Sequence, residues 1–196
     1  MLIYVIRHGQ TDWNAERRLQ GQKDIPLNAT GREQARLNGV GLANSLKAEG
    51  IAFDFVASPL GRTRATMEIM REAMNLPPLD YRTDERLVEI SFGDWEGFTI
   101  KELKAVQRER VAERNLNKWD FIPPGHDAES YEILSWRTGS WLNSVDRPTV
   151  CVTHGGVIRT FFRLMTGLAK DVAAEGQSPQ DRILKMDTSA KLIGWI

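Results

Sequence analysis

The sequence predicts an α/β fold, a three-layer α/β/α sandwich in which helices cover both faces of a mostly parallel sheet. Short apolar runs rich in β-branched residues alternate along the chain with longer stretches of helical periodicity. The apolar runs are continuous, as expected for strands that are buried on both faces. A chain of 196 residues is long enough for one sizeable core. We therefore expect a single domain spanning residues 1–196.

The first strand–helix unit is predicted from the apolar run Leu2–Ile6 and from a helix signal further along the chain. Thr30 and Glu33 have the spacing of a capping box, which predicts that a helix begins after Thr30. Gly50 predicts that this helix ends near Glu49, because glycine commonly follows the last helical residue.

The second unit begins with the strand expected at Phe53–Ala57. This strand leads directly into Ser58-Pro59, which predicts a helix cap followed by proline at the first helical position. We expect the helix to cover residues 60–74 and to end before Pro77-Pro78, with a short strand at residues 79–81.

The middle of the chain is more polar. Residues 100–117 favour a helix but have few apolar positions, so we expect a solvated outer helix there. A loop is expected at residues 119–125. Residues 129–145 carry apolar side chains at helical spacing and predict a further helix.

The last part of the chain begins with the strand expected at residues 149–153. A helix is expected from Gly156 to about residue 165, followed by a loop at residues 173–181. The two remaining apolar runs, Ile183–Asp187 and Leu192–Ile196, are expected to pair as a hairpin.

The composition excludes several classes of protein. Lys+Arg and Asp+Glu both number 26, so no net charge draws the whole chain to nucleic acid or to an anionic membrane. No stretch has the length of a membrane span or the form of a signal peptide, so we expect a cytoplasmic protein. Cys151 is the only cysteine, which excludes an internal disulfide. Its apolar neighbours favour a buried core residue over a nucleophile.

Three of the predicted strands end in residues that suit an anion site. Arg7 and His8 follow the first strand, Arg62 the second and His154 the third. If these strands are parallel neighbours, their carboxyl ends share one edge, which is where such folds bind ligands. Guanidiniums match phosphate oxygens, and the helix N-termini add N–H donors. The pattern therefore predicts a phosphate pocket containing these four side chains.

Each of these residues alone has a simpler interpretation. An arginine–histidine pair after a strand usually lies in a surface loop, and Arg62 alone would be a solvated helix residue. Only the coincidence at three strand ends favours the pocket. The three histidines lack zinc-ligand spacing, and no phosphate-binding P-loop or dinucleotide-binding motif follows a strand. We therefore expect no metal and no nucleotide cofactor.

Four sequence blocks follow in order and cover nearly the whole chain. They are Arg7–Asn14 with Asp24–Leu27, Ser58–Thr63, Leu87–Gly97 and Val152–Arg159. Together they resemble the signature of the histidine phosphatase superfamily, whose members have a phosphoglycerate mutase-like fold. One block would be weak evidence, whereas four blocks in order are strong evidence.

The resemblance implies a reaction that passes through a phosphohistidine. His8 would attack the phosphorus, while Glu89 would protonate the departing alkoxide and then help to activate water. Arg7, Arg62 and His154 would stabilise charge in the transition state, so that no metal would be needed. The phosphate-binding residues implied by the resemblance are Arg7, Asn14, Gln20, Gly21, Arg62 and His154.

The segment after Glu89 bears on the type of reaction. Residues 90–97, Ile-Ser-Phe-Gly-Asp-Trp-Glu-Gly, resemble the phosphatase branch of the superfamily more than the glycolytic mutases. We therefore expect a metal-independent phosphomonoesterase that acts on a small phosphorylated metabolite. Mutase-type phosphoryl transfer and a non-catalytic phosphate-binding module are the alternatives, and the intact catalytic set argues against the module. The sequence leaves open whether the protein forms a homodimer.

Residues 97–130 are expected to form a lid that determines specificity, because connecting segments commonly carry function. Pro124-Gly125 and Glu129-Ser130 resemble a phosphatase motif, with extra residues between them. His126 lies in this insertion, and it could touch the substrate or face solvent, which is the commoner position for a loop histidine. Four aromatic residues could line an apolar rim or pack in the core: Trp13, Trp95, Trp119 and Phe121.

Overall fold

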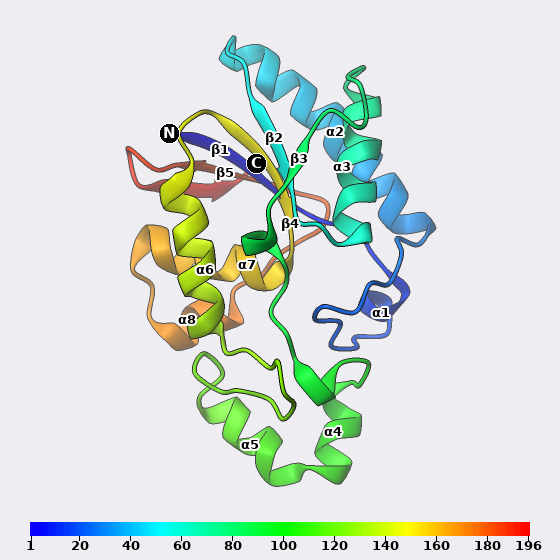
Figure 1. Ribbon diagram of the computed structural model, residues 1–196, viewed down its shortest axis with the longest axis vertical. Coiled ribbons are helices and arrows are strands. Elements are labelled where there is room, and N and C mark those ends of the chain that lie inside the picture. Colours follow the sequence, from blue (N-terminus) through cyan, green and yellow to red (C-terminus); the bar gives the residue numbers. More distant parts are fainter.

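A six-stranded sheet forms the centre of the computed structural model, which describes all 196 residues (Figure 1). The strand order is β3-β2-β4-β1-β5-β6. Strands β1 to β4 are parallel, whereas β5 runs antiparallel to β1, and β6 antiparallel to β5. The strands are β1 (Leu2–Arg7), β2 (Asp54–Ala57), β3 (Arg82–Thr83), β4 (Thr149–Thr153), β5 (Ile183–Asp187) and β6 (Leu192–Trp195).

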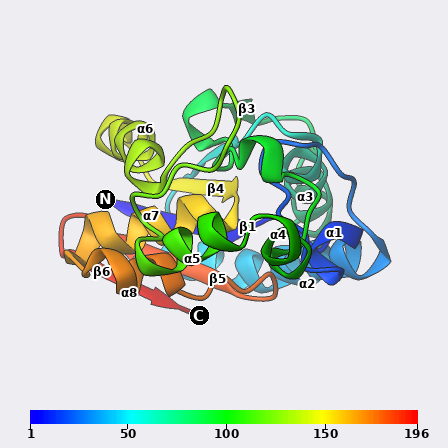
Figure 2. The same ribbon diagram turned by 90° about the horizontal axis from the view of Figure 1, so that it is seen from below.

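Helices cover both faces of this sheet, which confirms the predicted three-layer α/β/α sandwich (Figures 1 and 2). Ile3 and Val5 of β1 pack in the core beneath α6, α7 and α8, while Tyr4 and Ile6 pack toward α2 and α3. The helices and 3-10 turns are α1 (Asp12–Ala15), α2 (Ala29–Glu49), α3 (Gly61–Ala73), η1 (Glu85–Leu87), η2 (Gly93–Trp95), α4 (Ile100–Val106), α5 (Arg108–Leu116), α6 (Tyr131–Ser144), α7 (Gly155–Thr166) and α8 (Lys170–Glu175).

The N-terminal cap predicted for α2 is wrong. Asn28 caps this helix by accepting a hydrogen bond from the backbone N–H of Gly31 at 3.0 Å, and Thr30 lies inside the first turn. Asparagine is as good a cap as threonine, and here it comes first along the chain. The predicted end is confirmed, because Gly50 follows Glu49 in the left-handed conformation with φ 65°.

The cap predicted for α3 is also wrong. Leu60 occupies the cap position, and the N–H of Gly61 donates to the Asp24 carboxylate at 2.8 Å. The hydroxyl of Ser58 instead pairs with the His154 ring at 2.8 Å. A side chain remote in sequence therefore performs the capping that local sequence reasoning assigned to Ser58.

Two further boundaries differ from the predictions. The third strand consists of Arg82 and Thr83 rather than residues 79–81, because only these two residues are in register with β2. The loop predicted at residues 173–181 begins later, because α8 extends to Glu175. The C-terminal hairpin is confirmed as β5 and β6.

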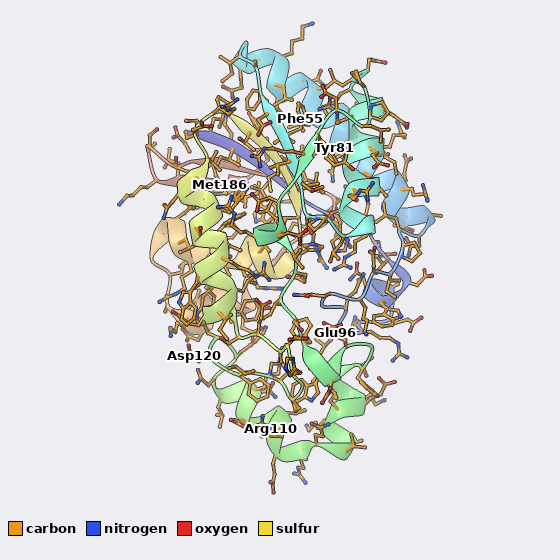
Figure 3. All side chains as sticks on the ribbon, viewed as in Figure 1. Phe55, Tyr81, Glu96, Arg110, Asp120 and Met186 are labelled. Carbon is orange, nitrogen blue, oxygen red and sulfur yellow. The ribbon has the colours of Figure 1, made fainter.

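The polar stretch 100–117 forms two helices, α4 and α5, that meet at Gln107. Leu103 and Val111 turn inward and form a small separate core with Trp95 and Phe121. This unit lies at the lower end of the molecule in Figure 1, and Figure 3 places Arg110 at its far end from the sheet. The 97–130 segment therefore has a core of its own beside the main sandwich. None of the helices in the fold combines the length and apolarity that crossing a bilayer requires.

Candidate active site

His8 follows β1 and is buried, with 2% of its surface exposed. Its Nδ1 lies 2.8 Å from the carbonyl oxygen of Gly9. Since that oxygen can only accept, Nδ1 carries the proton and Nε2 keeps its lone pair. Burial, followed by the charges of Arg62 and Arg7, holds the pKa of His8 well below its usual value. The imidazole is therefore neutral and nucleophilic at Nε2.

His154 follows β4 and lies behind His8, completely buried, with the two ring centroids 5.2 Å apart. Its Nδ1 lies 3.3 Å from a guanidinium nitrogen of Arg62, which can only donate. The Nε2–H therefore donates to the Ser58 hydroxyl at 2.8 Å. Burial, with the neighbouring Arg62 charge, holds the pKa of His154 well below its usual value. These contacts fix both the tautomer and the orientation of the ring.

Arg7 and Arg62 bring two guanidiniums to the same edge of the sheet. Arg62 is 1% exposed, and it donates to the carbonyl oxygens of Lys23 at 2.6 Å and Gly21 at 2.7 Å. Arg7 donates to the carbonyl oxygen of Ser178 at 2.8 Å, and its buried Nε has no partner. Burial lowers the pKa of each guanidinium to about 10, so both stay charged at neutral pH.

The predicted residues Asn14, Gln20 and Gly21 form the third side of this site. Asn14 completes a capping box with Thr11 at the start of α1. Its side-chain nitrogen lies 3.2 Å from the Gln20 side chain, and its side-chain oxygen accepts from Gln180 at 3.0 Å. Gly21 has φ 54°, a left-handed conformation that turns its carbonyl oxygen toward Arg62.

Glu89 lies opposite His8, on the loop after η1. Both of its carboxylate oxygens accept from the backbone N–H of Gly156, at 3.0 and 3.1 Å, and one also accepts from Ile90 at 3.0 Å. The N–H of Gly156 belongs to the first turn of α7, where the positive end of a helix dipole favours a carboxylate. The side chain is therefore held at the start of the helix that follows His154.

These side chains surround one cavity of about 120 Å³. Every predicted site residue lines it except His154, which lies behind its floor. Several other residues line the cavity, and the sequence analysis gave them no role. Of these, Arg159 is the one that the sequence could best have indicated. It stands one helical turn after Gly155 in α7, and residues four apart share a helix face. The lining residues that were missed are Arg18, Leu19, Phe92, Tyr131 and Arg159.

The sequence matches the family model of the histidine phosphatase superfamily (branch 1) over residues 3–184. The chain belongs to the histidine phosphatase superfamily. It is 34% identical to phosphoglycerate mutase-like protein 4 of Arabidopsis thaliana over 87% of this chain and 73% of that protein.

Two crystal structures resemble this chain along most of its length. A phosphoglycerate mutase from Thermus thermophilus superposes with a TM-score of 0.70 and 31% identity, covering 95% of this chain and 93% of that one. The α-ribazole phosphatase from Shigella flexneri superposes with a TM-score of 0.79, covering 100% and 95% of the two chains. At 24% identity, the second match supports the fold alone.

An ion pair between Glu129 and Arg137 holds the loop that carries Glu89. The two carboxylate oxygens of Glu129 accept from Arg137 at 3.0 and 2.9 Å, and one also accepts from the N–H of Ser91 at 3.0 Å. Arg137 in turn donates to the carbonyl oxygen of Glu89 at 2.9 Å and to that of Val88. In this member of the superfamily, Glu129 and Arg137 therefore fix the backbone on both sides of the predicted proton donor.

The remaining predictions about individual side chains are resolved by their exposure. His126 is 96% exposed and pairs with Asp127, so it faces solvent. Cys151 is fully buried in the sheet core, where burial raises the pKa of its thiol. Three of the four aromatic residues pack in cores rather than on a rim, and Trp13 is half-buried. The buried three are Trp95, Trp119 and Phe121.

Proposed function

We propose that the protein is a metal-independent phosphomonoesterase that acts through a phosphohistidine on a small phosphorylated metabolite. The observation that supports this most strongly is the state of His8. Its Nδ1 is bound to the Gly9 carbonyl oxygen, which leaves Nε2 free in a cavity lined by guanidiniums. A neutral imidazole with a fixed tautomer is the form that a phosphoryl acceptor needs.

In the first step, His8 Nε2 attacks the phosphorus and the bond between phosphorus and the ester oxygen breaks. Glu89 donates its proton to the departing alkoxide, which leaves as an alcohol. Arg7 and Arg62 donate to the equatorial oxygens, where negative charge collects in the transition state. The His154 ring, fixed by Ser58, accepts from Arg62 and so helps to hold that guanidinium beside His8.

In the second step, water attacks the phosphorus and the bond between phosphorus and His8 Nε2 breaks. Glu89 accepts a proton from that water and returns to the acid form. Inorganic phosphate leaves, and His8 is neutral again with its proton on Nδ1. The same carboxyl group thus serves as the acid in one step and as the base in the next.

A phosphoryl transfer to a second organic hydroxyl is the alternative, because two relatives carry phosphoglycerate mutase names. The phosphatase assignment rests on residues 90–97, whose sequence resembles that of the phosphatase branch. The two functions differ only in whether water or a substrate hydroxyl receives the phosphoryl group from His8.

The test is the release of inorganic phosphate from a panel of phosphomonoesters with EDTA present, for the wild type and His8→Ala. The panel contains 3-phosphoglycerate, sugar phosphates, nucleoside monophosphates and an aryl phosphate. We expect EDTA-resistant hydrolysis that disappears in His8→Ala. Mass spectrometry of acid-labile, base-stable phosphate on the wild type identifies the phosphorylated residue.

Two outcomes contradict the proposal. Interconversion of 2- and 3-phosphoglycerate without net phosphate release would replace the phosphatase with a mutase. Hydrolysis that survives in His8→Ala would exclude His8 as the nucleophile.

A further inference from the structure

The charges that line the cavity do not balance. Four guanidiniums face it, whereas Glu89 is the only carboxylate among its lining residues. Arg18 is neutralised by Glu16 at 2.6 Å and by Glu102 at 3.1 Å. Arg7 and Arg62 are the pair expected on a phosphoryl dianion. Arg159 then remains without a counterion.

Arg159 is held firmly but has no acidic partner. Its Nε donates to the carbonyl oxygen of Gly176 at 2.8 Å, and one terminal nitrogen donates to the Tyr131 hydroxyl at 3.3 Å. The pKa of Arg159 is raised by Tyr131 and by the carboxylates of Glu89 and Glu175, but neither carboxylate forms an ion pair with it, and its second terminal nitrogen has no hydrogen-bond partner. A partly buried charge without a counterion is costly, so such a group in a cavity indicates a charged ligand.

The residues around Arg159 aim it at the cavity. Tyr131 is 4% exposed and stacks on Trp119 with ring centroids 5.5 Å apart, so its hydroxyl cannot swing away. A Cβ on Gly155 would lie 3.5 Å from an Arg159 nitrogen and 3.4 Å from Arg7 Nε. The two guanidiniums therefore flank the same glycine, and neighbouring groups of one ligand can reach both of them.

Two further cations from the 97–130 segment lie beside Arg159. Burial lowers the pKa of Arg114, and the like charge of Arg159 adds to this effect. Burial likewise lowers the pKa of Lys118. This lysine forms an ion pair with Glu175, with a nitrogen–oxygen distance of 3.0 Å. The charges of Arg114, Lys118 and Arg159 thus act on one another, and the nearby Glu175 carboxylate pairs with Lys118 and not with Arg159.

We infer that Arg159, with the Tyr131 hydroxyl, forms a second anion site, so that the substrate is a phosphomonoester carrying another anionic group, a carboxylate or a second phosphoryl. This inference rests on the proposed phosphatase function. The ester phosphoryl binds at Arg7, Arg62 and His8, and the second anion binds at Arg159. Arg159 is thus a residue that determines specificity rather than one that acts on the phosphorus.

The test compares three esters with one carbon skeleton. Glycerol 1-phosphate carries no second anion, 3-phosphoglycerate carries a carboxylate, and glycerol 1,3-bisphosphate carries a second phosphoryl. For the wild type, we expect KM to be about 10- to 100-fold lower for at least one ester with a second anion than for glycerol 1-phosphate, the range of a charge-assisted hydrogen bond. A lower KM for 3-phosphoglycerate than for glycerol 1,3-bisphosphate would indicate that the site prefers a carboxylate. The reverse order would indicate that it prefers a phosphoryl group.

The variant Arg159→Gln should remove this advantage. We expect its KM for the favoured ester to rise about 10-fold or more, while kcat and the constants for glycerol 1-phosphate change less than about threefold. Arg147→Gln, an exposed arginine paired only with Asp146, is the matched control and should leave all three esters unchanged. An equal loss for all three esters in Arg159→Gln would overturn the inference, as would a wild type that shows no preference.

A binding experiment separates this inference from the proposed function. Calorimetry on the His8→Gln protein measures the Kd of the three esters without turnover, and then again with Arg159→Gln added. Tighter binding of an anionic ester that Arg159→Gln abolishes supports the second anion site, even if no ester is hydrolysed. Equal Kd values for all three esters would reject the site, whatever the activity assays show.

Discussion

The floor and the wall of the cavity are built in different ways. The floor consists of Arg7, His8 and Arg62, with His154 behind it, and these residues end a strand of the central sheet, follow one or begin the next helix. The wall is formed by the Glu89 loop with Phe92, by residues 18–21 and by Tyr131 and Arg159, whereas no residue of the 97–130 segment lines the cavity. Figure 3 places Glu96 where the chain passes from the sandwich to α4, and its carboxylate accepts from the N–H of Gln22 at 2.9 Å.

This difference indicates which parts of the cavity must be held rigidly. Groups that must meet the phosphoryl oxygens are buried among strands that are paired on both sides. The proton donor lies on a loop that the Glu129–Arg137 ion pair holds in place, whereas Tyr131 and Arg159 lie on the helices α6 and α7 that cover the sheet. Chemistry is therefore expected to depend on single residues in the floor, and specificity on the wall, which can change without altering the sheet.

The largest effect is expected for a floor residue, Arg62. Arg62→Met should lower kcat by about 10³-fold or more, because guanidiniums that stabilise phosphoryl transfer contribute about 10³- to 10⁵-fold. Arg64→Met, an exposed arginine on the same helix, is the control and should keep wild-type activity. Steady-state kinetics on an alkyl phosphate measure the loss. A loss of less than about tenfold would remove Arg62 from the transition state.

The next effect concerns the proton donor in the wall. Glu89→Gln should lower kcat about 10²- to 10⁴-fold for an alkyl phosphate, the range of general acid–base catalysis. Formation of the phosphoenzyme from 4-nitrophenyl phosphate should be much less affected, because its leaving group needs no proton. Burst kinetics separate the two steps. Equal losses with both esters would argue against an acid role, and Glu85→Gln, an exposed neighbour, is the control.

A smaller effect is expected where the wall is held in place. Arg137→Met removes donors from the carbonyl oxygens of Glu89 and Val88, so we expect kcat for an alkyl phosphate to fall about 10- to 100-fold through misplacement of Glu89. The burst with 4-nitrophenyl phosphate should persist, as in Glu89→Gln. Arg36→Met, exposed on α2, should behave as wild type. If the burst is lost together with kcat, Arg137 supports the whole fold and not the acid.

The smallest expected effect is on the free energy of unfolding, and it arises from the two buried histidines, His8 and His154. His8 and His154 have pKa values well below 6.5 in the folded protein, so below pH 6.5 the unfolded chain binds more protons. The free energy of unfolding should be highest above pH 6.5 and should fall as the pH drops, by up to about 1.4 kcal/mol per pH unit for each histidine.

Urea unfolding at a series of pH values between about 5 and 8 measures this slope. His8→Asn should make it shallower, whereas His126→Asn should leave it unchanged because that ring is 96% exposed. An unchanged slope in His8→Asn would mean that the pKa of His8 is the same in the folded and unfolded states.

The sequence was most informative about the floor. Strand runs and motifs at strand ends predicted that Arg7, His8, Arg62 and His154 meet, because parallel strands share an edge. The wall was harder to predict. Arg159 and Tyr131 come from different helices, so local patterns could not predict their contact, although the spacing from Gly155 indicates which helix face carries Arg159. Asp24, which caps α3 and lies 3.9 Å from Arg62, was likewise missed, because its partners are far away along the chain.

The position of β1 within the sheet affects how the protein is made. Of the six strands, β1 is synthesised before the others, yet it pairs with β4 and β5, which come more than 140 residues later. Contacts between residues so far apart in sequence form late and slowly. During synthesis, β1 therefore remains an unpaired apolar strand until β4 and β5 have emerged, and the site around His8 cannot form before then.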